Sequence, residues 1–291
     1  VEPGRIYGFL GPNGAGKSTT MNIITGYLGA TSGEVKINGY DIFAQPEEAK
    51  KCVGYLPELP PLYMDMTVKE YLNFVADLKK LERSLRANYV KEAMQTTKIL
   101  DVQDRMIRNL SKGYRQRVGF AQAILGYPEV IILDEPTVGL DPKQIIEIRD
   151  LIKELGKKHT IILSSHILSE ISAVCDHVFI ISKGKLVASD STENLVNLMS
   201  GAQEIELTVK GETERAKQLL KELPQAVKVE EKTSQEPQTS AFLITAEKNC
   251  DIREDIFHQF ANNGMPILQM QAVVKSLEDV FLELTQEGGQ K

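Results

Sequence analysis

The order of apolar and polar residues along the first 190 or so positions switches repeatedly between a strand-like and a helix-like period. Short β-branched runs predict buried strands, and apolar residues three or four positions apart predict helices between them. One helix is predicted from Lys17 to about residue 27, and another begins at Asp141-Pro142, where aspartate caps and proline fits the first turn. The predicted strands are Ile6–Leu10, Val130–Leu133, Thr160–Leu163, Val178–Ile181 and Leu186–Ala188. This alternation is typical of an α/β domain built on a parallel sheet.

Two local signals interrupt the alternation. Asn38-Gly39 lies between the strand-like segments 34–37 and 40–43 and predicts a hairpin, because both residues accommodate the positive φ angles of a type I′ turn. Thr67-Val68-Lys69-Glu70 has the spacing of a capping box and starts a stretch of helical period. Strand signals are then absent from about 67 to 127, and we predict a helical insertion over that range.

Past about residue 200 the pattern becomes that of a smaller unit. Ile205, Leu207 and Val209 alternate with polar residues, which predicts a half-exposed strand. The sequence therefore predicts an α/β sheet domain over 1–200 and an accessory α+β domain over 202–291. The further elements expected in the second domain are helices at about 212–222 and 252–262, strands near 227–229, 242–245 and 267–273, a polar stretch at 230–240 and a last helix at 277–284.

Composition and charge narrow the class of protein. The 291 residues are 42% apolar and 25% charged, as in a folded globular chain. The 34 basic and 40 acidic residues give a net charge of −6, so no nucleic-acid partner is expected. The three cysteines are far apart and odd in number, which favours reduced structural thiols, and no uncharged apolar run could span a bilayer. We expect the authentic start, with a further N-terminal strand, to lie upstream of Val1.

The segment between the first predicted strand and helix has the chemistry of a phosphate site. It fills the pattern Gly-x4-Gly-Lys-Ser, known as Walker A. Its glycines let backbone N–H groups converge on phosphate oxygens, and the following helix adds the positive end of its dipole. We expect Lys17 to reach the β- and γ-phosphates of ATP and Ser18 to coordinate Mg²⁺. The candidate nucleotide-binding residues are Gly11, Pro12, Asn13, Gly14, Ala15, Gly16, Lys17, Ser18 and Thr19.

Two acids end the predicted strand Val130–Leu133. Asp134 and Glu135 would be delivered to the carboxyl edge of the sheet, where α/β proteins bind their ligands. Asp134 is expected to hold Mg²⁺, and Glu135 to polarise an attacking water as general base. The alternative, a pair of solvated acids that merely end a strand, is disfavoured by the Walker A segment earlier in the chain.

Four further segments resemble one family, the ATP-binding cassette (ABC) ATPases. Leu110-Ser111-Lys112-Gly113-Tyr114-Arg115-Gln116-Arg117 is similar to the Leu-Ser-Gly-Gly-Gln signature of that family. The other three matches are Gly139-Leu140-Asp141-Pro142 to its D-loop, His166 to its switch histidine, and Gly54-Tyr55-Leu56-Pro57-Glu58 to its glutamine loop. With Walker A, the matches follow the family order over residues 1–190.

The resemblance implies a P-loop ATPase fold of ABC type and a role for each matched residue. His166 would orient the γ-phosphate, Asp141 would signal across a dimer, and Glu58 would contact nucleotide and Mg²⁺. Ser111 and Gly113 would contact the γ-phosphate held by the Walker A segment of a second subunit, so that a homodimer, or a heterodimer with a similar ATPase, encloses two ATP molecules. A separate transmembrane permease would dock between the Glu58 loop and the helical insertion, with this chain peripheral on the cytoplasmic face of the bacterial plasma membrane.

The C-terminal part of the sequence narrows the resemblance to one group within the family. Residues 202–285 look like the accessory domain of the bacterial type-2 exporter group, which includes drug, polysaccharide, antibiotic-resistance and gliding-motility transporters. The leading hypothesis is thus the ATP-hydrolysing subunit of an exporter. The alternatives are a soluble ABC ATPase acting in translation or DNA maintenance, and a module that uses ATP only as a switch. A single Walker A and the lack of sustained heptads disfavour the first, and Glu135 with His166 disfavours the second.

The sequence departs from the family pattern in three respects. Glu58 stands where the family has glutamine, which exchanges an amide for an anion that only accepts hydrogen bonds. Lys112 and Tyr114 alter the signature but leave its serine and second glycine in place. The aromatic residue that stacks on adenine is expected upstream of residue 1, because Tyr7 lies within the first predicted strand and is expected in the core.

Overall fold

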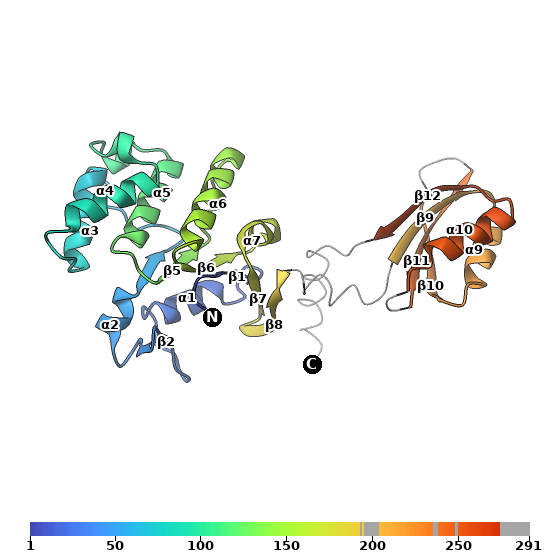
Figure 1. Ribbon diagram of the computed structural model, residues 1–291, viewed down its shortest axis with the longest axis horizontal. Helices are drawn as coiled ribbons and strands as arrows, with labels where there is room; N and C mark the ends of the chain where they lie inside the picture. Colours follow the sequence, from blue (N-terminus) through green and yellow to red (C-terminus); the bar gives the residue numbers. More distant parts are fainter. Residues whose placement is uncertain (193, 195–203, 235–237, 248–249, 274–291) are drawn as a thin grey trace. The chain divides into compact units, whose positions relative to one another are not determined.

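The computed structural model describes residues 1–192, 194, 204–234, 238–247 and 250–273. These residues fall into two compact units, one that ends near residue 192 and one within the remaining described segments. Each unit has its own sheet and its own core, and each is described by itself (Figure 1).

A six-stranded sheet forms the centre of the first unit. Its strand order is β4-β5-β6-β1-β7-β8, and all neighbours are parallel except β8, which returns antiparallel to β7. The strands β5 and β6 are buried along nearly their whole length, as their unbroken apolar runs predict. The six strands are β1 (Ile6–Leu10), β4 (Val53–Leu56), β5 (Val130–Asp134), β6 (Thr160–Ser165), β7 (His177–Ser182) and β8 (Lys185–Ser191).

The register of the sheet decides what meets at its carboxyl edge. Leu10, the last residue of β1, pairs with Ser165, and Asp134, the last residue of β5, pairs with Ser164. The segments that follow these three neighbouring strands therefore lie side by side. They are the Walker A loop, the turn that begins at Glu135 and the residues around His166.

Four helices and a hairpin accompany the sheet. The hairpin of β2 (Lys36–Ile37) and β3 (Tyr40–Asp41) is confirmed, with φ angles of 51° at Asn38 and 85° at Gly39. Tyr7 is buried in the core, where its ring stacks on Phe179. The four helices are α1 (Lys17–Ile24), α2 (Pro46–Lys51), α6 (Pro142–Gly156) and α7 (Leu168–Val174).

Between β4 and β5 the described chain is helical, and its helices gather at one end of the unit (Figure 1). The capping box is confirmed, since the Thr67 side chain accepts from the Glu70 N–H and the Glu70 carboxylate accepts from the Thr67 N–H. Lys79 donates to the carbonyls of three residues at the end of α5, and its burial there lowers the pKa of Lys79 to about 8. The helices are α3 (Val68–Leu78), α4 (Arg86–Thr96) and α5 (Lys112–Ile124), with 3₁₀ turns at Leu100–Val102 and Ile107–Asn109.

The second unit is an antiparallel sheet with two helices on one face (Figure 1). Its element order β-α-β-β-α-β and strand order β10-β11-β9-β12 are those of a ferredoxin-like domain. Ile205, Leu207 and Val209 point into its core, as their alternation predicts. The predicted helix at 277–284 lies outside the described residues. The stretch predicted as polar between 230 and 240 contains the end of β10 and the start of β11. The elements of this unit are β9 (Glu204–Lys210), α9 (Thr213–Lys221), β10 (Ala226–Lys232), β11 (Thr239–Ala246), α10 (Arg253–Asn262) and β12 (Ile267–Val273).

Candidate functional site

The Walker A loop joins β1 to α1 in a conformation that only glycine adopts at ease. Gly16 has a φ of 106°, in the left-handed region that other residues avoid. A Cβ on Gly11 would lie 2.5 Å from the carbonyl oxygen of Ile181 in β7, so a side chain at this position is excluded. The loop is closed by a bond from the Ala15 N–H to the Pro12 carbonyl. A glycine-rich loop of this kind, between a strand and a helix, is suited to binding an anion through its backbone amides.

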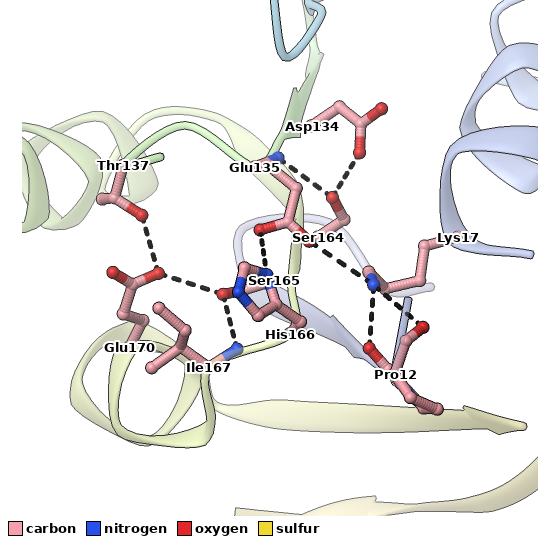
Figure 2. A network of polar contacts seen from close by, with 11 residues as sticks. Pro12, Lys17, Asp134, Glu135, Thr137, Ser164, Ser165, His166, Ile167 and Glu170 are labelled. Atoms are coloured by element: carbon pink, nitrogen blue, oxygen red, sulfur yellow. Dashed lines mark hydrogen bonds and ion pairs between the residues drawn. The ribbon is translucent and has the colours of Figure 1, made fainter. Parts of the chain in front are cut away.

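Lys17 folds back over this loop. Its side chain is only 6% exposed, and its Nζ donates to the carbonyl oxygens of Gly11 at 2.8 Å and Pro12 at 3.3 Å. The same ammonium forms an ion pair with Glu135 Oε1 at 3.4 Å (Figure 2). Because Glu135 is equally buried, each charge compensates the other in an environment where a lone charge would be costly.

Glu135 is held in a strained backbone conformation directly after β5. Its φ of 47° is unfavourable for a residue with a side chain, by about 1–2 kcal/mol. Its N–H donates to both the carbonyl oxygen and the hydroxyl of Ser164, at 3.2 and 3.0 Å. The Ser164 hydroxyl in turn donates to Asp134, so one buried serine fixes both acids at the end of the strand.

His166 contacts the other oxygen of Glu135. Its Nδ1 lies 2.9 Å from Glu135 Oε2, and its ring is more exposed than the carboxylate (Figure 2). Glu135 therefore stands between an ammonium and an imidazole, with one carboxylate oxygen directed to each. The three residues predicted as catalytic, Lys17, Glu135 and His166, come together at the carboxyl edge of the sheet.

These groups open into a cavity of about 390 Å³. Glu58, from the loop after β4, reaches the same cavity and adds a second carboxylate to it. The structure thus brings most of the predicted Walker A residues to the same cavity as Glu135 and His166, which are predicted as catalytic. The lining consists of Asn13, Gly14, Gly16, Lys17, Ser18 and Thr19 from the loop and α1, and of Glu58, Glu135, Val138 and His166.

The oxygen atoms around this cavity suit a hard divalent cation. Within the described residues no three His, Cys, Asp or Glu side chains form a metal cluster by themselves. Of the predicted metal ligands, Ser18 and Glu58 line the cavity, whereas Asp134 is buried at the end of β5 next to Glu135 and is not part of the lining. Mg²⁺ is commonly bound by one or two such groups together with substrate phosphates, so the donor set fits this ion when a nucleotide completes it.

The predicted signature residues lie elsewhere. Ser111 caps α5, and together with Gly113 it lines a separate cavity of about 260 Å³. The neighbouring Asp141 caps α6 by accepting from the Gln144 N–H at 2.9 Å. A Cβ on Gly113 would lie 2.7 Å from the side chain of Gln144, so the start of α5 packs tightly on the start of α6. The structure does not bring these predicted phosphate contacts to the cavity that contains Lys17.

Sequence reasoning missed a polar cluster beside the cavity. The carboxylate of Glu170, in α7, accepts from Thr137 at 2.6 Å and from Ser165 at 3.0 Å, and all three side chains are buried. Ser164, which fixes Asp134 and Glu135, was missed as well. Ser164 belongs to none of the sequence motifs, and its role follows only from the pairing of β5 with β6.

Comparison with known proteins gives a consistent family assignment. The sequence model of the ABC transporter family matches residues 1–138. The bacitracin transport ATP-binding protein BcrA of Bacillus licheniformis is 33% identical over 98% of this chain and 89% of its own length. The linearmycin resistance ATP-binding protein LnrL of Bacillus subtilis is 29% identical over 98% of this chain and 91% of its own. A solved ATP-binding subunit of an ABC transporter has a TM-score of 0.62 and 30% identity, with 69% of this chain and 84% of that chain covered.

Proposed function

The chain belongs to the ABC transporter family as an ATP-binding, ATP-hydrolysing subunit, and from this premise we propose which residues perform the chemistry and what it drives. The expected ABC-type α/β fold and ATPase activity are confirmed by relatives that match along nearly the whole chain and by a solved ATP-binding subunit that matches 69% of it. A soluble ATPase of translation or DNA maintenance is not favoured, since these relatives are transport and resistance proteins.

ATP binding would begin with an exchange of partners at Lys17. In the structure its ammonium is held by two loop carbonyls and Glu135. We propose that the β- and γ-phosphates take the place of Glu135, while the amides of residues 11–16 and the start of α1 bind the remaining phosphate oxygens. Ser18, Asp134 and Glu58 would hold Mg²⁺, which supplies charge neutralisation between the phosphates when bound. The exchange releases the Glu135 carboxylate into the cavity.

Hydrolysis would then use the released carboxylate as general base. Glu135 accepts a proton from the water that attacks the γ-phosphate, as the bond from phosphorus to the ADP oxygen breaks. His166 already lies 2.9 Å from this carboxylate and keeps it directed into the cavity. The observation that carries the proposal is this convergence of Lys17, Glu135 and His166 on one buried point.

A second copy of the chain, or a similar ATPase, would complete the site. Ser111 and Gly113 line a cavity separate from that of Lys17, so a nucleotide held at Lys17 has no signature contact within the same copy. The start of α5 offers free amides and the positive end of a helix dipole to a phosphate from outside. ATP would therefore favour the dimer by contacting both copies, and loss of the γ-phosphate would favour reopening.

The partner that receives this motion would be a separate transmembrane subunit. No helix in the described part of the chain combines the length and the apolar character needed to cross a bilayer. After Glu58, three apolar side chains are exposed to solvent: Leu59 by 79%, Tyr63 by 55% and Met64 by 38%. Such a patch is suited to an apolar segment of another protein. We propose that it docks the permease of an exporter, with this chain peripheral on the cytoplasmic face of the plasma membrane.

The test is a comparison of Glu135→Gln with Glu129→Gln, an exposed acid at the other end of the same strand. Glu135→Gln is expected to bind ATP at least as tightly as the native protein, because the carboxylate that competes with the phosphates for Lys17 is gone, and to lose most of its turnover. Glu129→Gln should keep native binding and native turnover. Saturating ATP with Mg²⁺ should also convert Glu135→Gln into a dimer in sedimentation. Near-normal hydrolysis by Glu135→Gln would refute the base assignment, and monomers under those conditions would refute the proposed dimer.

A further inference from the structure

One buried carboxylate beside the cavity has no part in the mechanism above. Glu170 lies in the first turn of α7 and is 5% exposed. No ion pair found among the described residues involves it. Burying a carboxylate without a cation is unfavourable unless its hydrogen bonds are satisfied, so the choice of glutamate here calls for a physical reason.

Two hydroxyl groups from different segments of the chain donate to one oxygen of this carboxylate. Thr137 and Ser165 both donate to Glu170 Oε2, at 2.6 and 3.0 Å. The Ser165 hydroxyl also accepts from the N–H of Ile167, so it closes the backbone turn that holds His166 (Figure 2). A single carboxylate oxygen therefore joins the two segments in which the proposed catalytic residues stand.

Thr137 and Ser165 lie next to the proposed catalytic residues in the sequence. Thr137 lies two residues after Glu135, in a short turn fixed by bonds from the Val138 N–H to the Glu135 carbonyl and from the Leu140 N–H to the Thr137 carbonyl. Ser165 is the residue before His166. Beyond the bonds from the Glu135 N–H to Ser164, two side-chain links join these segments: the His166 to Glu135 contact inside the cavity, and the Glu170 carboxylate, which is not part of the cavity lining.

The two links differ in what happens to them during a catalytic cycle. The link inside the cavity is between the half-exposed ring of His166 and the carboxylate of Glu135, which must turn toward the substrate during hydrolysis. The link through Glu170 joins side chains that are each at least 95% buried and that face no solvent. Hydrogen bonds in such a place are strong and geometrically restrictive. The second link can therefore hold the spacing of the two segments while the first is broken.

We propose that Glu170 is a positioning residue for ATP hydrolysis, which sets the distance between the Glu135 turn and the His166 turn. This proposal rests on the roles proposed above for Glu135 and His166. It assigns Glu170 no contact with nucleotide or water. Its effect should appear in the chemical step and not in nucleotide binding, since the Walker A loop has no bond to Glu170, Thr137 or Ser165.

The test compares kcat and KM for ATP in four variants of the full chain. Glu170→Ala removes the acceptor, and Thr137→Val removes one donor while preserving shape. Each should lower kcat about ten- to a hundred-fold with little change in KM, because small misplacements of catalytic groups have effects of that size. Glu170→Gln keeps an acceptor oxygen and should restore most of kcat. Ile171→Val, a fully buried apolar neighbour in α7, is the control for a weakened helix and should keep its kcat.

A double variant separates positioning from general loss of structure. If Glu170 and Thr137 act through one bond, Glu170→Ala with Thr137→Val should be hardly worse than Glu170→Ala alone. The proposal is overturned if Thr137→Val and Glu170→Ala both hydrolyse ATP at rates close to native, or if kcat falls only in proportion to the folded fraction. Glu135→Gln is measured beside these variants. Normal turnover of Glu135→Gln would refute the proposed function. An inactive Glu135→Gln together with a native-like Glu170→Ala would refute only the positioning role of Glu170.

Discussion

Replacing Ser164 with alanine should disturb both acids of the site through the loss of one oxygen atom. The hydroxyl donates to Asp134 and accepts from the N–H of Glu135, and the residue is fully buried. A hydrogen bond to a charged acceptor contributes about 1.5–3 kcal/mol. The Glu135 N–H keeps its second acceptor, the Ser164 carbonyl, so its loss is smaller. We expect Ser164→Ala to lower the free energy of unfolding by about 2–3 kcal/mol.

Calorimetry of the thermal transition of the first unit measures this effect directly. For a unit of this size each kcal/mol shifts the melting temperature by about 2–4 °C, so the expected fall is about 4–12 °C. Turnover should drop about tenfold or more, because Glu135 is freed to leave its unfavourable φ of 47°. Ser172→Ala, which loses only an intrahelical bond to the Leu168 carbonyl, is the matched control and should stay within about 0.5 kcal/mol of native. A Ser164→Ala protein with native melting temperature and native turnover would show that the serine does not hold the two acids.

Two further predictions concern the helical segment between β4 and β5. Thr67→Ala removes the acceptor of the Glu70 N–H and should lower the free energy of unfolding by about 1 kcal/mol in urea titrations, whereas an unchanged midpoint would contradict the capping role. Burial lowers the pKa of Lys79 to about 8 from its ordinary 10.5, so the unfolded chain binds more protons between these values and stability should rise with pH across that window, by up to about 3 kcal/mol. In Lys79→Met this rise should vanish, and parallel pH curves for the native and variant proteins would exclude Lys79 as its source.

Much of this architecture could be predicted from the sequence because its signals are local. The strand Ile6–Leu10, the turn at Asn38-Gly39 and the box at Thr67 each depend on residues within a few positions of one another. The elements that were missed, β4, α2 and α7, are four, six and seven residues long. Fewer than two helical turns, or a strand interrupted by Gly54, cannot establish a period that stands out from its surroundings.

The candidate site also contains residues that local motifs predict and residues that they do not. Lys17, Glu135 and His166 were placed by motifs, and the structure brings them together as expected. Ser164 and Glu170 were not, because the acids that Ser164 contacts and the Thr137 partner of Glu170 lie about 30 residues away and become neighbours only when β5 pairs with β6. A lone serine in an apolar strand, or a lone glutamate in a short helix, has no pattern that distinguishes it from an ordinary residue. The roles of Ser164 and Glu170 follow only from their tertiary contacts.

The contact between Lys17 and Glu135 has a consequence for which ligands Lys17 can accept. Glu135 already serves Lys17 as a counter-ion, so an incoming ligand must offer Lys17 more negative charge than one carboxylate provides. A triphosphate does so, whereas a nucleoside offers none and a monophosphate little. The ion pair therefore favours ligands with several anionic groups, whatever base or sugar they carry.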